Sequence, residues 1–260
     1  MANRIDLKFK GLKKTDKKAL ITFITAGDPD IDTSFEIVEK MIENGIDLLE
    51  IGIPFSDPLA EGPTIEKASY RALDSNTTTD DVFSLVRRIR EKHELPILLM
   101  LYVNLVYKYG IEKFMKQCRE TGVDGLIIPD MPFEEVEEFR IIAHEYELEI
   151  INLVAPTTKD ERLKKIVKGS EGFIYCVSSL GVTGERKNIT TDLGEFYKRL
   201  SQATDLPLAL GFGLSNREQI DGLEGDWDGY IVGSAIVNII AKHGKESPVH
   251  VGDFIKSLKD

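Results

Sequence analysis

Cysteine and long apolar segments are both scarce in this chain of 260 residues. Its two cysteines, Cys118 and Cys176, show neither metal-site spacing nor a disulfide framework, so a reducing compartment is expected. No apolar run reaches the ~18 residues of a membrane span, and the lysine-rich start, Met1–Thr15, has no signal-peptide core. These absences together predict a cytoplasmic protein with no membrane association.

Positive charge is also in deficit. Lys and Arg number 33 against 44 Asp and Glu, which gives a net charge of −11. A chain this acidic offers no basic stripe for the phosphates of DNA or RNA, so nucleic-acid binding is not expected. Any phosphorylated ligand would have to be held locally, by backbone N–H groups.

Short apolar runs, by contrast, recur along the whole chain and alternate with amphipathic stretches. Strands are expected at Ala19–Thr25, Ile46–Ile53, Pro96–Tyr102, Gly125–Pro129, Glu149–Val154, Gly172–Val177, Pro207–Gly211 and Gly229–Val232. Helices are expected between them, at Thr33–Asn44, Thr64–Ser75, Thr79–His93, Gly110–Thr121, Phe133–Tyr146, Asp160–Lys168, Asp192–Ala203 and Asn216–Leu223, and then at Ser234–His243.

This alternation predicts an α/β protein with one domain over residues 1–260, a (β/α)8 TIM barrel. An open doubly wound sheet is the alternative, but no G-x-G-x-x-G motif follows the first strand. The amphipathic stretch Arg4–Lys14 predicts an additional N-terminal helix that plugs the bottom of the barrel.

The most informative single residue is Glu50, which stands inside an apolar strand. A carboxylate buried there without partners costs several kcal/mol unless it is paired, neutral or open to water. At the carboxyl end of a barrel strand, a neutral or water-accessible carboxyl is typical of a catalytic acid/base. A buried structural ion pair is the alternative interpretation.

The loop after that strand carries two more carboxylates, Asp57 and Glu61, on a stretch stiffened by prolines. Asp57 precedes a proline and could serve only to form a turn. Glu61 is long for a turn residue, which leaves it free to reach the mouth of the barrel.

Glycine-rich loops follow the last three strands, at residues 178–184, 211–215 and 233–235. Barrels that bind phosphate build the site from late loops and a helix N-terminus, where glycine lets backbone N–H groups approach the anion. Ser234 adds a hydroxyl donor. The order of these loops therefore predicts a phosphate site without lysine.

None of the eight predicted strands contains lysine or histidine. A Schiff-base aldolase needs a desolvated lysine, and a metal-dependent aldolase needs clustered ligands such as histidines. The sequence thus favours carboxylate acid–base chemistry on a phosphorylated substrate, with no metal site and no covalent intermediate.

Residues 49–65, which read LEIGIPFSDPLAEGPTI, closely resemble the signature of the tryptophan synthase alpha chain family. The resemblance continues through FITAGDP at 23–29, YVN at 102–104, IPDMP at 128–132, LGVTG at 180–184 and GFG at 211–213, and covers essentially the whole chain. It implies a TIM barrel that cleaves indole-3-glycerol phosphate to indole and glyceraldehyde 3-phosphate in tryptophan biosynthesis.

The resemblance also implies roles for particular residues. Glu50 would be the general acid/base, and Glu61 would accept a hydrogen bond from the indole N–H. The other implied site residues are Phe23, Tyr102, Tyr175 and Thr183 for the substrate, with Thr183 on a lid, and Gly184, Gly213, Gly233 and Ser234 for its phosphate. The family usually has aspartate at position 61, so glutamate here is a departure.

A partner is implied as well, the tryptophan synthase beta chain, in an alpha2beta2 heterotetramer. The alpha chain would need no cofactor, because pyridoxal phosphate belongs to the beta chain. The contact would involve Asp57, Pro58, Asp130 and Pro132. Two alternatives stay open: a stand-alone indole-3-glycerol-phosphate lyase, and a weakly active barrel that acts mainly as an activator of a beta chain. A generic phosphosugar isomerase would leave residues 54–63 unexplained.

Overall fold

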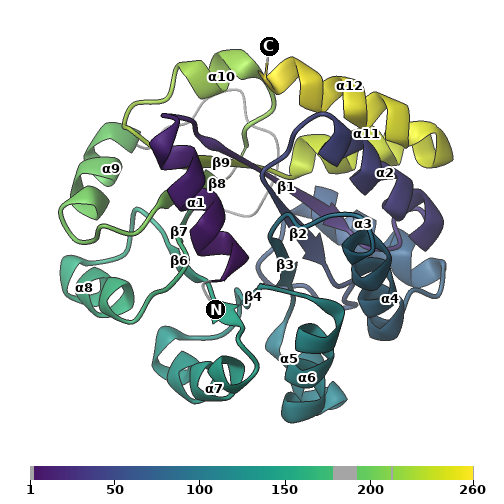
Figure 1. Ribbon diagram of the computed structural model, residues 1–260, viewed down its shortest axis with the longest axis horizontal. Coiled ribbons are helices and arrows are strands. Elements are labelled where there is room, and N and C mark those ends of the chain that lie inside the picture. The colour runs from purple at the N-terminus through teal and green to yellow at the C-terminus, as the bar shows by residue number, and fades with distance from the viewer. Residues whose placement is uncertain (1–2, 178–191, 212, 260) are drawn as a thin grey trace.

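The computed structural model describes residues 3–177, 192–211 and 213–259, which form a parallel sheet ringed by helices (Figure 1). The strands are β1 (Ala19–Thr25), β2 (Leu48–Gly52), β3 (Ile97–Met100), β4 (Gly125–Ile127), β5 (Glu149–Ile150), β6 (Asn152–Val154), β7 (Ile174–Val177), β8 (Leu208–Gly211) and β9 (Gly229–Val232). The helices are α1 (Arg4–Lys14), α2 (Ile31–Glu43), α3 (Pro63–Asp74), α4 (Thr79–Arg90), α5 (Val103–Tyr109), α6 (Ile111–Thr121), α7 (Phe133–Glu145), α8 (Asp160–Lys168), α9 (Leu193–Ser201), α10 (Arg217–Asp221), α11 (Ser234–His243), a 3-10 turn η1 (Gly244–Glu246) and α12 (Ser247–Lys259).

The strand order is that of a nearly closed barrel. It runs β5-β4-β3-β2-β1-β9-β8-β7-β6, and the described pairings are parallel. The predicted fifth strand is in fact two pieces, because β5 pairs with β4, β6 pairs with β7, and Ile151 separates them. Both ends of the sheet thus belong to one short segment. The predicted TIM barrel is confirmed, and the open doubly wound sheet does not fit.

The barrel interior is filled by apolar side chains from alternate positions of the strands. Ile21, Leu48, Leu98 and Ile231 share one buried cluster, as expected where every second residue points inward. This cluster is closed at one end by the N-terminal helix.

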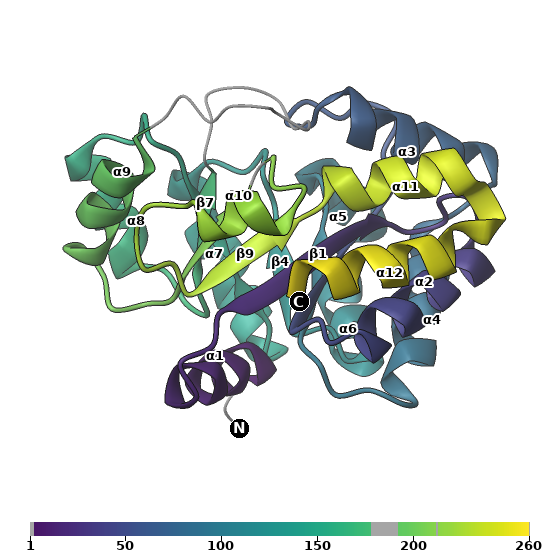
Figure 2. The ribbon, with the colours of Figure 1, turned by 90° about the horizontal axis from the view of Figure 1, so that it is seen from above.

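Helix α1 forms that closure, which confirms the predicted plug. Its Ile5 and Phe9 are buried in the same interior cluster, and the Phe9 ring lies 5.4 Å from that of Phe173. The Asn3 side chain caps the helix by accepting from the Ile5 N–H, and its amide donates to the Asp124 carbonyl. Figure 2 shows α1 at one end of the barrel, away from α3 and α11.

Helices cover the outer face of the sheet, so the strands are buried on both sides. All seven residues of β1 are buried, for example. The largest apolar cluster lies in this outer layer and joins Leu49 and Leu99 of the strands with Ile37 and Phe83 of the helices. Such two-sided burial explains the nearly continuous apolar runs in the sequence.

Two helices were not predicted, and their presence corrects the element list. Helix α5 occupies a segment for which neither helix nor strand is predicted, and its first N–H, on Val103, donates to the side chain of Asp130. Helix α12 forms the end of the described chain and packs against α2 and α11. The predicted helix boundaries elsewhere agree to within a few residues.

Candidate functional site

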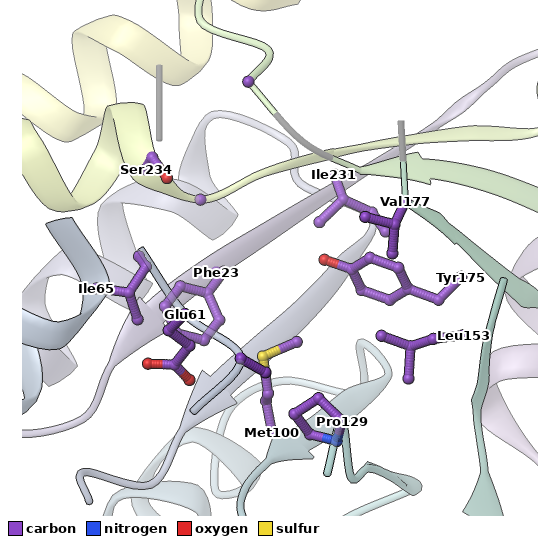
Figure 3. Close-up of a pocket in the computed structure, with 13 residues that line it drawn as sticks. Phe23, Glu61, Ile65, Met100, Pro129, Leu153, Tyr175, Val177, Ile231 and Ser234 are labelled. Carbon is purple, nitrogen blue, oxygen red and sulfur yellow. The ribbon is translucent and has the colours of Figure 1, made fainter. Parts of the chain in front are cut away.

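The carboxyl ends of the strands meet at the barrel end opposite α1, where they surround a cavity of about 220 Å³. Figure 3 shows Phe23, Glu61, Ile65 and Met100 on one side of it and Leu153, Tyr175 and Val177 on the other. The remaining lining residues are Ala60, Pro129, Gly213, Ile231, Gly233 and Ser234. Two predicted substrate residues, Phe23 and Tyr175, therefore face the same cavity.

Glu61 brings a carboxyl group into this mostly apolar cavity. It lies in the loop between β2 and α3, and its Oε2 is buried with no hydrogen-bond partner among the described residues. Burial raises the pKa of Glu61 to about 7. The group can therefore be either charged or neutral near neutral pH.

Glu50 lies deeper and does not line the cavity. It is fully buried on β2, beside Phe23 of β1 in the strand register. Neither of its oxygens has a hydrogen-bond partner within the described part of the chain, which gives no support to the structural ion pair. Burial raises the pKa of Glu50 to about 8, so the carboxyl is mostly protonated at neutral pH.

The Tyr175 phenol senses the charges of both acidic groups. Burial, and then the charges of Glu50 and Glu61, raise the pKa of the Tyr175 phenol well above its ordinary value. The phenol thus lies within electrostatic range of both carboxyl groups, and it stays neutral.

Three of the predicted phosphate residues line the cavity, and two of them lie at the start of α11. Gly233 is the residue that precedes the helix, Ser234 is its first residue, and both line the cavity with Gly213. Gly213 has a φ of +75°, a conformation that favours glycine. The described lining contains no lysine, arginine or histidine, so an anion here would depend on backbone N–H groups and the Ser234 hydroxyl. Gly184 and Thr183 lie outside the described residues.

Comparison with known proteins identifies the family. A family model described as "Tryptophan synthase alpha chain" matches residues 9–259. The tryptophan synthase alpha chain of Caldanaerobacter subterraneus subsp. tengcongensis is 53% identical over 260 residues, with 99% of each chain covered. That of Alkaliphilus metalliredigens is 47% identical, with 99% of this chain and 97% of the relative covered.

Solved structures agree. Tryptophan synthase subunit alpha from Legionella pneumophila has a TM-score of 0.88 at 35% identity and covers 100% of this chain and 98% of its own. A subunit in the tryptophan synthase a2b2 complex of Pyrococcus furiosus has a TM-score of 0.84 at 34% identity, with 93% of this chain and 97% of that chain covered.

This chain belongs to the tryptophan synthase alpha chain family. The family cleaves indole-3-glycerol phosphate in tryptophan biosynthesis, which confirms the predicted lyase activity and substrate. Its alpha chains need no cofactor of their own, and pyridoxal phosphate belongs to the beta chain. Among the described residues, no group of three or more His, Cys, Asp or Glu is placed to hold a metal ion.

Tyr102 differs in its placement from Phe23 and Tyr175, the two predicted substrate residues that line the cavity. It is buried directly before α5 and is absent from the described cavity lining. Its phenol oxygen accepts from the Ala60 N–H at 2.9 Å, and its ring stacks on Phe55 at 5.1 Å. It contacts the loop that carries Glu61.

The predicted partner residues lie in two loops at the cavity end of the barrel. Asp57 and Pro132 are exposed, and Pro58 and Asp130 are half-buried. Asp130 also accepts from the Val103 N–H, next to Tyr102. Because Tyr102 contacts the Glu61 loop, the two predicted contact loops are joined through it.

Several lining residues of the alpha-chain cavity were not predicted, chiefly Ile65, Met100, Pro129, Leu153, Val177 and Ile231. A signal for most of them was available in the sequence. They continue the inward-facing alternation at the carboxyl ends of the predicted strands, where every second side chain faces the barrel axis.

No helix within the described ranges is long and apolar enough to cross a membrane.

Proposed function

We propose that this chain cleaves indole-3-glycerol phosphate with two carboxyl groups, Glu50 as the general acid/base and Glu61 as the carboxylate that stabilises the ring. The observation that carries the proposal is their placement: Glu61 lines a mostly apolar cavity, Glu50 is buried beside Phe23 of the same lining, and both oxygens of Glu50 and the Oε2 of Glu61 are buried without hydrogen-bond partners among the described residues. Burial raises the pKa of Glu50 to about 8, which suits proton transfer near neutral pH, and that of Glu61 to about 7, at which the carboxylate form is also available.

Glu50 acts first as the acid. In its protonated form it gives its proton to the ring carbon that bears the side chain. As a carboxylate it then takes the proton of the hydroxyl on the adjacent side-chain carbon. The bond between these two carbons breaks, its electron pair returns to the ring, and the side chain leaves as an aldehyde. Since Glu50 does not line the cavity, its side chain must turn toward the bound ring.

Glu61 supports the ring during this step. Its carboxylate accepts a hydrogen bond from the indole N–H and stabilises the positive charge that develops when the ring is protonated. Phe23 and Tyr175 provide apolar walls for the ring. The phosphate is held by Gly213, Gly233 and Ser234, together with the predicted Gly184. Thr183 has the role on a lid that the family resemblance implies.

The test is turnover of indole-3-glycerol phosphate by the purified chain, alone and with a beta chain. Glu50→Gln should lower kcat at least ~100-fold, the usual contribution of a general acid/base. A Glu50→Gln variant as fast as the parent would overturn the proposed role. A parent chain that does not cleave, but still stimulates the beta chain, would favour the activator alternative.

We also propose a cytoplasmic alpha2beta2 assembly with a beta chain, through the face that carries Asp57, Pro58, Asp130 and Pro132. The Pyrococcus furiosus relative, described as part of a mutually activating a2b2 complex, supports this assembly. The free thiols of Cys118 and Cys176, both buried, support a reducing location. Size-exclusion chromatography with and without a beta chain separates this proposal from a stand-alone lyase.

A further inference from the structure

The loop between β2 and α3 presents Glu61 to the cavity but has little packing of its own. Ser56, Asp57 and Ala60 are exposed, and Leu59 is 83% exposed. A loop of this kind needs contacts from elsewhere to hold a catalytic group at a fixed position.

Tyr102 supplies two such contacts, one at Phe55 just before the exposed residues and one at Ala60, the last of them. Its ring stacks on that of Phe55 at 5.1 Å with an interplanar angle of 25°. Its phenol oxygen accepts from the Ala60 N–H at 2.9 Å, directly before Glu61. The same side chain therefore holds the loop both near its start and next to the catalytic carboxyl.

Tyr102 is itself well fixed. It is only 3% exposed and stands directly before α5, whose Val103 N–H donates to Asp130 at 3.0 Å. Burial raises the pKa of Tyr102 to about 12, so its phenol stays neutral at working pH and the contact with Ala60 does not titrate there.

We propose that Tyr102 is a positioning residue for Glu61, acting through the loop rather than by touching the substrate. This inference rests on the proposed function of Glu61. A displacement of about 1 Å at a reacting group can cost roughly 100-fold in rate, so a contact next to the carboxyl has a large effect.

The test combines Tyr102→Phe, which keeps the ring and removes the acceptor oxygen, with Glu61→Gln. The probe is an indole-3-alkyl phosphate without side-chain hydroxyls, which cannot be cleaved because the departing aldehyde needs that oxygen. In the parent, Tyr102→Phe should weaken binding of this probe and lower kcat, each by up to about 10-fold, the value of one hydrogen bond. In the Glu61→Gln background the same change should alter probe binding by less than about twofold, because the positioned carboxylate is already gone.

Tyr107→Phe is the matched control, since Tyr107 is on α5 but 56% exposed and its ring forms a T-shaped pair with that of Phe139. It should leave probe binding and kcat unchanged. Thermal unfolding of each variant checks that the fold is intact. Tyr102→Leu, which also removes the ring, should lower kcat further.

Two results would overturn the inference: equal losses in both backgrounds, which would mean that Tyr102 contacts the ligand directly, or no loss in either. Failure of the proposed function looks different, because then the parent would not cleave, or Glu61→Gln would cleave as fast as the parent.

Discussion

Glu61 is one methylene longer than the aspartate that the family usually has at this position, a difference of about 1.5 Å in reach. We expect Glu61→Asp to retain cleavage within about 10-fold of the parent, because the charge is kept. Glu61→Ala should lose about 100-fold in kcat/KM, because the ring N–H loses its charged partner. Steady-state turnover of indole-3-glycerol phosphate measures both.

The control for that series is Asp74→Ala, which removes an exposed carboxylate at the end of α3. Its turnover should match that of the parent. If Glu61→Ala also matched the parent, residue 61 would have no part in the reaction.

Glu50 makes stability depend on pH. Burial raises its pKa from 4.5 to about 8, so the folded state binds its proton more tightly than the unfolded state does. The stabilisation that this group gives is complete below pH 4.5 and is lost as the pH rises through about 8. The unfolding free energy of the parent should therefore fall between about pH 5.5 and 8.5. Glu50→Gln should make this fall smaller by a few kcal/mol.

Urea unfolding at the two pH values measures this change. Glu149, whose pKa burial also raises to about 8, lies at the other end of the barrel and gives a second contribution, so some slope should remain in Glu50→Gln. An unchanged slope in that variant would contradict the proposed protonation state of Glu50.

Among the elements, the junction of α1, α4, β3 and β4 depends on one buried ion pair. Asp124, just before β4, pairs with Arg90 of α4 at 2.6 Å, and their side chains are 4% and 9% exposed. Asp124 also accepts from Arg4 of α1 and from the Ile97 N–H of β3. Asp124→Asn leaves the buried guanidinium without its counter-charge and should lower the unfolding free energy by about 3 kcal/mol.

The control for Asp124→Asn is Glu94→Gln. Glu94 also pairs with Arg4, but its side chain is 79% exposed. Its effect should stay below about 0.5 kcal/mol, as is usual for surface ion pairs. Equal losses of unfolding free energy in the two variants would mean that burial does not determine how much the Asp124–Arg90 pair contributes to stability.

The strands and helices also show which parts of this fold could be predicted from the sequence alone. The strands and the plug follow from local apolar periodicity, so they could be predicted. Helix α5 could not, because its first N–H is satisfied by Asp130, which is distant in sequence. The missed α12 did carry a local signal, since Val251, Ile255 and Leu258 recur at helical spacing and are buried.

The site was predictable to a similar extent. Its carboxyl groups and glycine loops stand out as local motifs, and the predicted residues that line the cavity are Phe23, Glu61, Tyr175, Gly213, Gly233 and Ser234. The position of Glu50 outside the cavity lining was not predictable, because it depends on which residues of neighbouring strands lie beside it. The contact of Tyr102 with Ala60 likewise depends on how two loops approach in space.

At the scale of the whole molecule, one face carries the cavity, the predicted contact residues and the exposed Leu59. Burying a leucine side chain contributes about 1.5–3 kcal/mol, so Leu59→Ser should weaken binding of a beta chain roughly 10-fold or more. Leu7→Ser is the control, because Leu7 is 56% exposed on α1, at the opposite end of the barrel. Titration calorimetry with the purified beta chain compares the two variants, and equal affinities would place the interface elsewhere.

The lack of basic side chains in the described cavity lining has a thermodynamic consequence for ligand binding. A phosphate ester brings about two negative charges into the cavity lined by Phe23, the strand neighbour of Glu50, with no cationic side chain in that lining to offset them. Binding must then make Glu50 still harder to ionise, so the complex takes up protons from the medium at about pH 8. The observed heat of association should accordingly differ between Tris and Hepes buffers, in proportion to their enthalpies of ionisation.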